Sequence, residues 1–149
     1  MKTQTEKGRV FRALHARDGA FIIPNPWDVG TARLLERLGF EALATTSAGY
    51  AFSVGQKDNT VNRGQTMEHV AAIASAGDLP VSADLGNGFG DAPETAAETI
   101  RLAAAGGAAG GSIEDSTGAR IIRFMRWDTR QSAYERRRKQ RMPWRFRSR

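Results

Sequence analysis

The sequence predicts an α/β fold in which successive βα units build a parallel sheet. Short apolar runs alternate with amphipathic stretches of helical length along residues 1–118, and this alternation is typical of such units. Glycine, proline and asparagine stand between the segments, where they end helices and open turns. Four βα units can be counted in this part of the chain.

The first two units lie within residues 1–45. A leading helix over residues 6–17 carries apolar residues at helical spacing and ends before Gly19. Residues 21–23 form the first predicted strand. Asp28 can cap a second helix, which runs to about residue 38, and residues 41–45 form the second predicted strand.

The third and fourth units follow a long predicted loop over residues 46–63. Residues 64–76 are expected to be helical, and residues 79–83 form the third strand. Pro93 favours the start of a helix that runs to about residue 105, because proline fits the first helical turn. The fourth strand covers residues 108–113.

Charge is distributed unevenly along the chain, which predicts a boundary near Gly118. Residues 1–118 contain 10 lysines and arginines against 14 aspartates and glutamates, whereas residues 119–149 contain 12 against 2. All 16 glycines lie at or before Gly118. We therefore expect a partial α/β domain over residues 1–118 and an Arg-rich, disordered or loosely helical tail over residues 119–149.

Several classes of protein are disfavoured by the composition. The chain contains no cysteine, which excludes a disulfide framework and a thiolate metal site. No stretch reaches the roughly 18 consecutive apolar residues of a membrane span, and the amino-terminal residues lack the apolar core of a secretory signal. We therefore expect a soluble cytoplasmic protein with no membrane partner.

Chemistry in parallel α/β sheets lies beyond the carboxyl ends of the strands, so the residues just after each apolar run are the candidate site. These positions share hydroxyl, carboxylate and aromatic side chains: Trp27, Asp28, Thr45, Thr46, Ser47, Asp58, Asp84, Glu114 and Asp115. We interpret Asp115 as structural. His15 and His69 fall within helices, and we expect both to be ordinary surface residues.

Carboxylates after several strands indicate a site for a hard cation. Mg²⁺ takes oxygen ligands and keeps several of its waters, and Mn²⁺ is the next choice. Glycine and hydroxyl groups after the second strand could hold a substrate carboxylate or phosphonate. In such a site the cation stabilises negative charge that develops on a 2-oxo acid as a neighbouring bond is cleaved or formed.

Four segments carry a resemblance to a known family. They are FIIPNPWDVGTARLLERLGF, EALATTSAGYAFSVGQKD, LPVSADLGNGFGD and GGSIEDSTG. In order and spacing they resemble the isocitrate lyase/phosphoenolpyruvate mutase superfamily, especially its small bacterial members related to carboxyvinyl-carboxyphosphonate phosphorylmutase. The resemblance implies the first half of a TIM-type (β/α)₈ barrel, which needs about 250 residues when complete.

The resemblance also implies a metal site. Asp84 matches the principal metal-binding aspartate of the family, and Asp58 and Glu114 match acidic residues that approach the metal largely through its waters. Gly86 departs from the family pattern, which usually has Asp or Glu two residues after the metal-binding aspartate. We therefore expect this chain to bind Mg²⁺ or Mn²⁺ more weakly than its relatives.

Substrate contacts are implied in the same way. Thr46, Ser47 and Ala48 match the loop that receives the substrate carboxylate, and Trp27 and Asp28 lie where the first loop borders the pocket. The family's catalytic acid or base often lies on a loop after the fourth strand. That loop has no counterpart here, so the catalytic residues stay unknown.

The implied activity is that of a Mg²⁺-dependent lyase or mutase, which cleaves or forms C–C or P–C bonds in small 2-oxo acids or phosphonates through an enolate. No counterpart of strands five to eight follows Gly118, and codons for Arg120–Met125 can be written that read Asp-His-Pro-Ile-Tyr when shifted by one base. We therefore expect a truncated, inactive copy that self-associates through open barrel edges, and we hypothesise a frameshift near codon 119 as its origin.

Two alternatives stay open. An assembled half-barrel could be active, and metal-dependent turnover would mark it. The basic tail, with the run Arg136–Lys139 and the aromatic residues Trp144 and Phe146, could bind nucleic acid or another polyanion. Salt-sensitive affinity with a sequence preference, lost on deletion of residues 119–149, would mark that function.

Overall fold

The computed structural model describes residues 1–115, so the boundary expected at Gly118 and the basic tail over residues 119–149 lie outside the described residues. The described elements are α1 (Gln4–Ala16), α2 (Val29–Arg37), β1 (Leu43–Ala44), α3 (Ser47–Ser53), α4 (Arg63–Ala74), β2 (Val81–Asp84), α5 (Pro93–Ala105) and β3 (Gly110–Ser112). Within residues 1–115, no helix has the length and apolar character needed to cross a membrane.

The three strands form a parallel sheet in the order β1-β2-β3. Leu43 is paired with Val81 in β2, and Asp84 at the end of β2 is paired with Ser112 in β3. A helix connects each strand to the next, since α4 lies between β1 and β2 in the chain and α5 lies between β2 and β3. The prediction of an α/β fold with a parallel sheet is confirmed.

The predicted first strand over residues 21–23 is wrong, because this segment forms no strand in the structure. The residues just after it contact the edge of β1, where the Ala44 N–H donates to the carbonyl of Pro24 at 3.0 Å. The Asn25 side-chain amide donates to the carbonyl of Ala44 at 3.1 Å. Pro24 and Pro26 have no N–H group to continue a ladder, which limits the pairing to this short contact.

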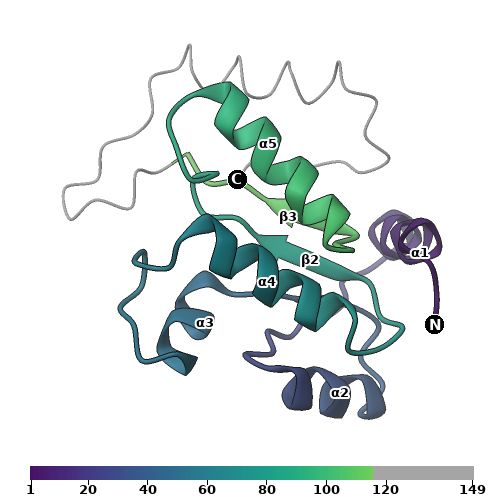
Figure 1. The fold of residues 1–149 in the computed structure, drawn as a ribbon. Helices are drawn as coiled ribbons and strands as arrows, with labels where there is room; N and C mark the ends of the chain where they lie inside the picture. Colours follow the sequence, from purple (N-terminus) through teal and green to yellow (C-terminus); the bar gives the residue numbers. More distant parts are fainter. Residues whose placement is uncertain (116–149) are drawn as a thin grey trace.

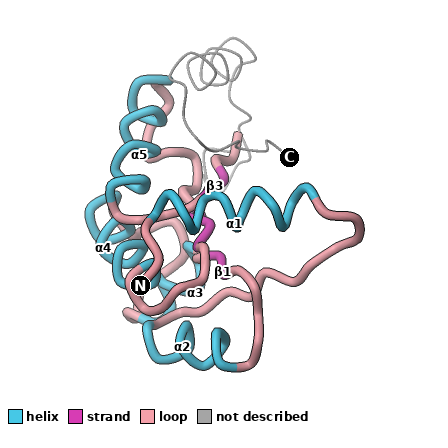
Figure 2. The backbone as a smooth tube through the Cα atoms, turned by 90° about the vertical axis from the view of Figure 1, so that its right-hand side faces the viewer, coloured by secondary structure: helices cyan, strands magenta, loops and turns pink. Residues whose placement is uncertain are grey.

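Helices α4 and α5 lie side by side on one face of the sheet, with α2 beyond α4 (Figures 1 and 2). Val81 and Ala83 of β2 are fully buried beneath them, as is Leu85 just after the strand. Because side chains alternate between the faces of a strand, Ser82 and Asp84 point to the opposite face. Asp84 is therefore directed away from the helical layer.

Helix α1 closes the amino ends of the strands (Figure 1). The ammonium of Lys7 is almost fully buried and donates to the carbonyls of Ala74 at 2.7 Å and Gly77 at 2.6 Å, just where α4 ends. The side-chain amide of Gln4 donates to the carbonyl of Ala108, which precedes β3. These contacts fasten one end of the sheet and leave the carboxyl ends of the strands for the site.

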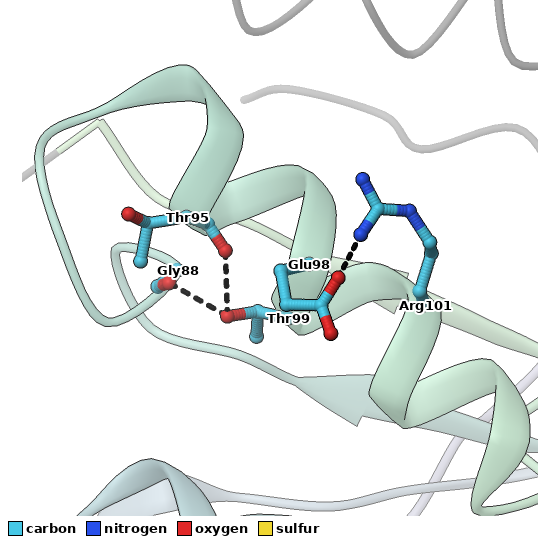
Figure 3. A network of polar contacts seen from close by, with 5 residues as sticks. All are labelled: Gly88, Thr95, Glu98, Thr99 and Arg101. Carbon is cyan, nitrogen blue, oxygen red and sulfur yellow. Dashed lines mark hydrogen bonds and ion pairs between the residues drawn. The ribbon is translucent and has the colours of Figure 1, made fainter.

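Helix α5 also holds the loop that follows β2 (Figure 3). The hydroxyl of Thr99 is fully buried and lies 2.8 Å from the carbonyl of Gly88 and 3.0 Å from that of Thr95. On the outer surface of the same helix, Arg101 forms an ion pair with Glu98. The Thr99 contact therefore fixes a loop whose neighbouring residues line the candidate site.

Candidate active site

A hollow of about 130 Å³ opens at the carboxyl end of the sheet. Residues from the ends of β2 and β3, from the loops that follow, and from the start of α3 and α4 surround it. They are Ser47, Asn59, Val61, Thr66, Asp84, Leu85, Gly86, Asn87, Phe89 and Glu114. This is the edge at which the sequence predicted the site.

Asp84 is the most firmly oriented side chain of the hollow. Its Oδ2 accepts a hydrogen bond from the Ser47 N–H at 2.8 Å, and its Oδ1 accepts one from the Gly86 N–H at 3.1 Å. The Asp84 N–H itself donates to the hydroxyl of Thr45 at 2.9 Å, which ties the end of β2 to the end of β1. These hydrogen bonds fix the orientation of the Asp84 carboxylate at the hollow.

Helix α3 supplies one of these donors, and it lies within a segment predicted to be a loop. Thr46 caps the helix, since its hydroxyl accepts from the Gly49 N–H at 3.3 Å. A Cβ at Gly49 would lie 2.3 Å from Nε1 of Trp27, so only glycine allows the indole to pack this closely on α3. The loop prediction was wrong here because a cap and a short apolar run suffice for seven helical residues.

Negative charge gathers around Asp84. The pKa of Glu114 is raised above its usual range, first by desolvation at the hollow and then by the charges of Asp84, Asp58 and Asp115. The Glu114 N–H donates to the carbonyl of Gly86 at 2.7 Å, which fixes the end of β3 against the loop after β2. Asp84 and Glu114 both line the hollow, whereas Asp58 is not among its lining residues.

These carboxylates do not converge tightly. Within residues 1–115, no group of three or more aspartate, glutamate or histidine side chains is arranged to ligate one ion directly. Asp58 is exposed on the loop between α3 and α4, where it accepts from the N–H of Asn59 at 2.8 Å. Mg²⁺ often binds through one or two carboxylates and keeps several waters, so this donor set fits a hydrated cation held chiefly by Asp84.

The predicted substrate residues are only partly brought together. Ser47 lines the hollow, whereas Thr46, Ala48 and Trp27 lie beside it and are not among the lining residues. Trp27 is 47% exposed, and its ring meets that of Phe52 edge to face at 6.4 Å. This contact packs the loop before α2 against α3, to which Phe52 belongs.

Asp28 has a structural role in the described chain. Its Oδ1 accepts from the Thr31 N–H at 2.7 Å, which caps α2. This hydrogen bond is the main reason that the pKa of Asp28 is lowered. The side chain is exposed and is not among the residues that line the hollow.

Sequence reasoning missed three residues at and before the start of α4. Asn59 and Val61 in the loop before α4 and Thr66 in its first turn line the hollow, whereas the sequence singled out only Asp58 in this region. The expectation that His69 is an ordinary surface residue was wrong, because its side chain is only 8% exposed and stacks on Tyr50. A lone histidine in a helix gives no sign of which face it occupies.

Comparison with known proteins gives a consistent match. The family model described as phosphoenolpyruvate phosphomutase matches residues 11–141, a range that extends past Gly118 into the basic segment. The 2-methylisocitrate lyase of Salmonella typhimurium is 30% identical over 115 residues, which are 76% of this chain and 39% of that protein.

Solved structures agree with this match. A structure described as a lyase/mutase from Burkholderia cenocepacia J2315 is 56% identical, with a TM-score of 0.89 over 97% of this chain and 53% of that chain. A phosphonopyruvate hydrolase in complex with oxalate and Mg²⁺ is 22% identical, with a TM-score of 0.87 over 95% of this chain and 51% of that chain, and shows the shared fold. The chain thus spans about half the length of these structures.

Proposed function

The chain belongs to the phosphoenolpyruvate phosphomutase family, and from this premise we propose that residues 1–115 form the cation-binding part of a Mg²⁺-dependent lyase or mutase site for small 2-oxo acids or phosphonates. The superfamily contains lyases and mutases that act on small acids. The observation that carries the proposal is the Asp84 carboxylate, which is oriented at the hollow by two backbone N–H groups, one at the start of α3 and one in the loop after β2. Mn²⁺ would serve as a substitute cation.

Each residue has a distinct part in the proposed site. Asp84 would hold the cation directly, and Asp58 and Glu114 would hold it through its waters. When bound, Mg²⁺ supplies positive charge that stabilises negative charge on the oxygens of a 2-oxo acid. The like charges that raise the pKa of Glu114 support this reading, because a cation would relieve their repulsion.

Substrate binding is assigned to the neighbouring loop. Ser47 lines the hollow beside Asp84, and the resemblance of Thr46 and Ala48 to the family's substrate loop extends this contact surface. The phosphonopyruvate hydrolase relative binds oxalate, a small dicarboxylate, and oxalate is therefore a suitable probe for this chain.

Calorimetric titration of MgCl₂ into the full chain tests the proposal. We expect Asp84→Asn to weaken Mg²⁺ binding at least about tenfold, because it removes the directly ligating charge while keeping the size of the side chain. Asp18→Asn is the matched control, since Asp18 is an exposed acid after α1, at the opposite end of the sheet. Equal Mg²⁺ affinity of the wild-type and Asp84→Asn proteins would overturn the assignment.

We also propose that a second copy of the chain is its partner. Several large apolar side chains are exposed, among them Ile22 at 73%, Leu38 at 66% and Phe52 at 56%. Exposed apolar surface of this kind often marks a protein interface. Sedimentation velocity at several concentrations should show a mass that rises with concentration, and a constant monomer mass would exclude self-association.

A further inference from the structure

His69 lies inside the molecule between two helices that border the site. It belongs to α4, and its ring stacks on the ring of Tyr50 in α3 with centroids 4.0 Å apart and an angle of 11° between the planes. The side chain is 8% exposed, and its buried Nε2 has no hydrogen-bond partner among the described residues. The specific contact of His69 is therefore the stack between the face of its ring and the ring of Tyr50.

The position of α3 determines the geometry of Asp84. Ser47 is the first residue of α3, and its N–H donates to Asp84 Oδ2 at 2.8 Å. Helix α3 has only seven residues, so a small shift at Tyr50 would be felt at its first turn. The second donor to Asp84, the Gly86 N–H, comes from the loop after β2 and does not depend on α3.

Stacking requires an uncharged imidazole in this environment. Burial lowers the pKa of His69, and the opposing effect of the Asp28 carboxylate at the start of α2 is smaller. The ring is therefore neutral near pH 7, and it can lie flat on Tyr50 without placing a buried charge between α3 and α4.

We propose that His69 is a positioning residue for the active site: through its stack on Tyr50 it holds α3 where the Ser47 N–H can orient the Asp84 carboxylate. The role belongs to the face of the ring and not to its nitrogen atoms. This inference deepens the proposed function. It rests on that function only in taking Asp84 as the residue that binds the cation.

Three substitutions separate the ring face from its nitrogens and from general stability. His69→Ala removes the stack, whereas His69→Phe keeps an aromatic ring and removes the buried Nε2 that lacks a partner. Ile73→Val is the matched control, because Ile73 is a buried residue one turn further along α4 that packs in a cluster with Leu43 and Val81. Tyr50→Leu removes the stack from the α3 side and replaces His69→Ala if that variant does not fold.

The test is the ¹H–¹⁵N spectrum of the full chain without metal, read at the amides of Ser47 and Gly86. We expect the Ser47 amide proton to move upfield in His69→Ala and Tyr50→Leu as its hydrogen bond to the carboxylate is lost. The Gly86 amide should stay in place, His69→Phe should restore the wild-type Ser47 position, and Ile73→Val should leave it unchanged. An unmoved Ser47 amide in both stack-removing variants, or failure of His69→Phe to restore it, overturns the inference.

Metal titration gives the second readout. His69→Ala should weaken Mg²⁺ binding by up to about tenfold, and His69→Phe should return it to the wild-type value. If the wild-type chain binds no Mg²⁺ at all, the proposed function fails, while the amide spectrum still decides whether His69 positions α3. The two failures are therefore distinguishable.

Discussion

Glu114 illustrates how a single side chain links stability to pH. Its pKa is raised, first by desolvation and then by Asp84, Asp58 and Asp115, so its charged form is less favoured in the folded protein than in the unfolded chain. When Glu114 is protonated, the folded protein does not carry the cost of its charge, so this contribution to stability is fully present below the ordinary pKa of 4.5. It is lost as the pH rises through the raised pKa that Glu114 has in the folded protein. We therefore predict that Glu114→Gln unfolds at a higher temperature than the wild type at pH 7.

Thermal unfolding of both proteins from about pH 4 to pH 8 checks this prediction, because the glutamine of the variant does not bind or release a proton in this range. The advantage of Glu114→Gln should shrink toward the acidic end, where the wild-type carboxyl is protonated. An advantage that is independent of pH, or a lower melting temperature of the variant at pH 7, would contradict the account.

Gly49 is a position where one added methyl group should disturb the site. A Cβ there would lie 2.3 Å from Trp27 Nε1 and 2.5 Å from Thr46 Cγ2, so Gly49→Ala must displace the indole or the helix cap. We predict a loss of about 1–3 kcal/mol in the free energy of unfolding. The indole N–H resonance of Trp27 should move at the same time.

The control is Gly8→Ala, in the middle of α1, where a Cβ would meet no atom within 4 Å. This variant should gain roughly 0.5–1 kcal/mol, because alanine favours a helix over glycine. If Gly49→Ala were as stable as Gly8→Ala and left the Trp27 resonance unchanged, the close packing of Trp27 on α3 would be wrong.

At the scale of the elements, Lys7 connects α1 to the end of α4. Its ammonium donates to the carbonyls of Ala74 and Gly77, and its burial is the main cause of its lowered pKa. Lys7→Met should cost about 1–3 kcal/mol, because two carbonyls at the end of a helix lose their donor. Chemical denaturation measures the loss, and Lys2→Met, which changes an exposed side chain, is the control.

The pH dependence of Lys7 gives this prediction a second check. A lysine whose folded pKa is lowered adds stability as the pH rises from the lowered value toward the ordinary 10.5. The wild type should therefore lose less stability than Lys7→Met over that range. Equal stability of the two proteins at neutral pH would show that the buried contacts of Lys7 contribute nothing.

The sequence predicted most helices to within a few residues. It failed where contacts between distant segments determine the local structure. The cap at Asp28 and the proline at residue 93 mark the starts of α2 and α5. Residues 21–23 have a strand-like composition, yet the prolines that follow prevent a ladder along β1. Helix α3 was missed because Gly49, which looks like a turn residue, is required there by the Trp27 contact.

A site residue could be predicted from the sequence only where it lies close to the carboxyl end of a strand, because the parallel sheet brings these ends together. Asp84 is the last residue of β2, and Ser47 and Glu114 come shortly after β1 and β3, so the parallel arrangement brings them to one edge. His69 could not be found in this way, because its role depends on which face of α4 packs against α3. Contacts across helices of this kind have no local signature in a single sequence.

For the whole molecule, the sheet has two very different faces. Helices α4 and α5 bury the large apolar side chains of one face, whereas the other face carries the small residues Ala44, Ser82 and Ser112, none of which is fully buried. Asp84 stands at its carboxyl end, which agrees with the inward-facing site of a barrel family.

The most direct test of the central claim is paramagnetic broadening by Mn²⁺ in the ¹H–¹⁵N spectrum of the full chain. Mn²⁺ takes the same oxygen ligands as Mg²⁺ and broadens the signals of amides close to it. The account predicts selective loss of the Ser47, Gly86 and Glu114 amides, reversed by excess Mg²⁺, with the Asp18 amide unaffected. Uniform broadening, or broadening centred away from Asp84, would contradict a metal site at the carboxyl end of this sheet.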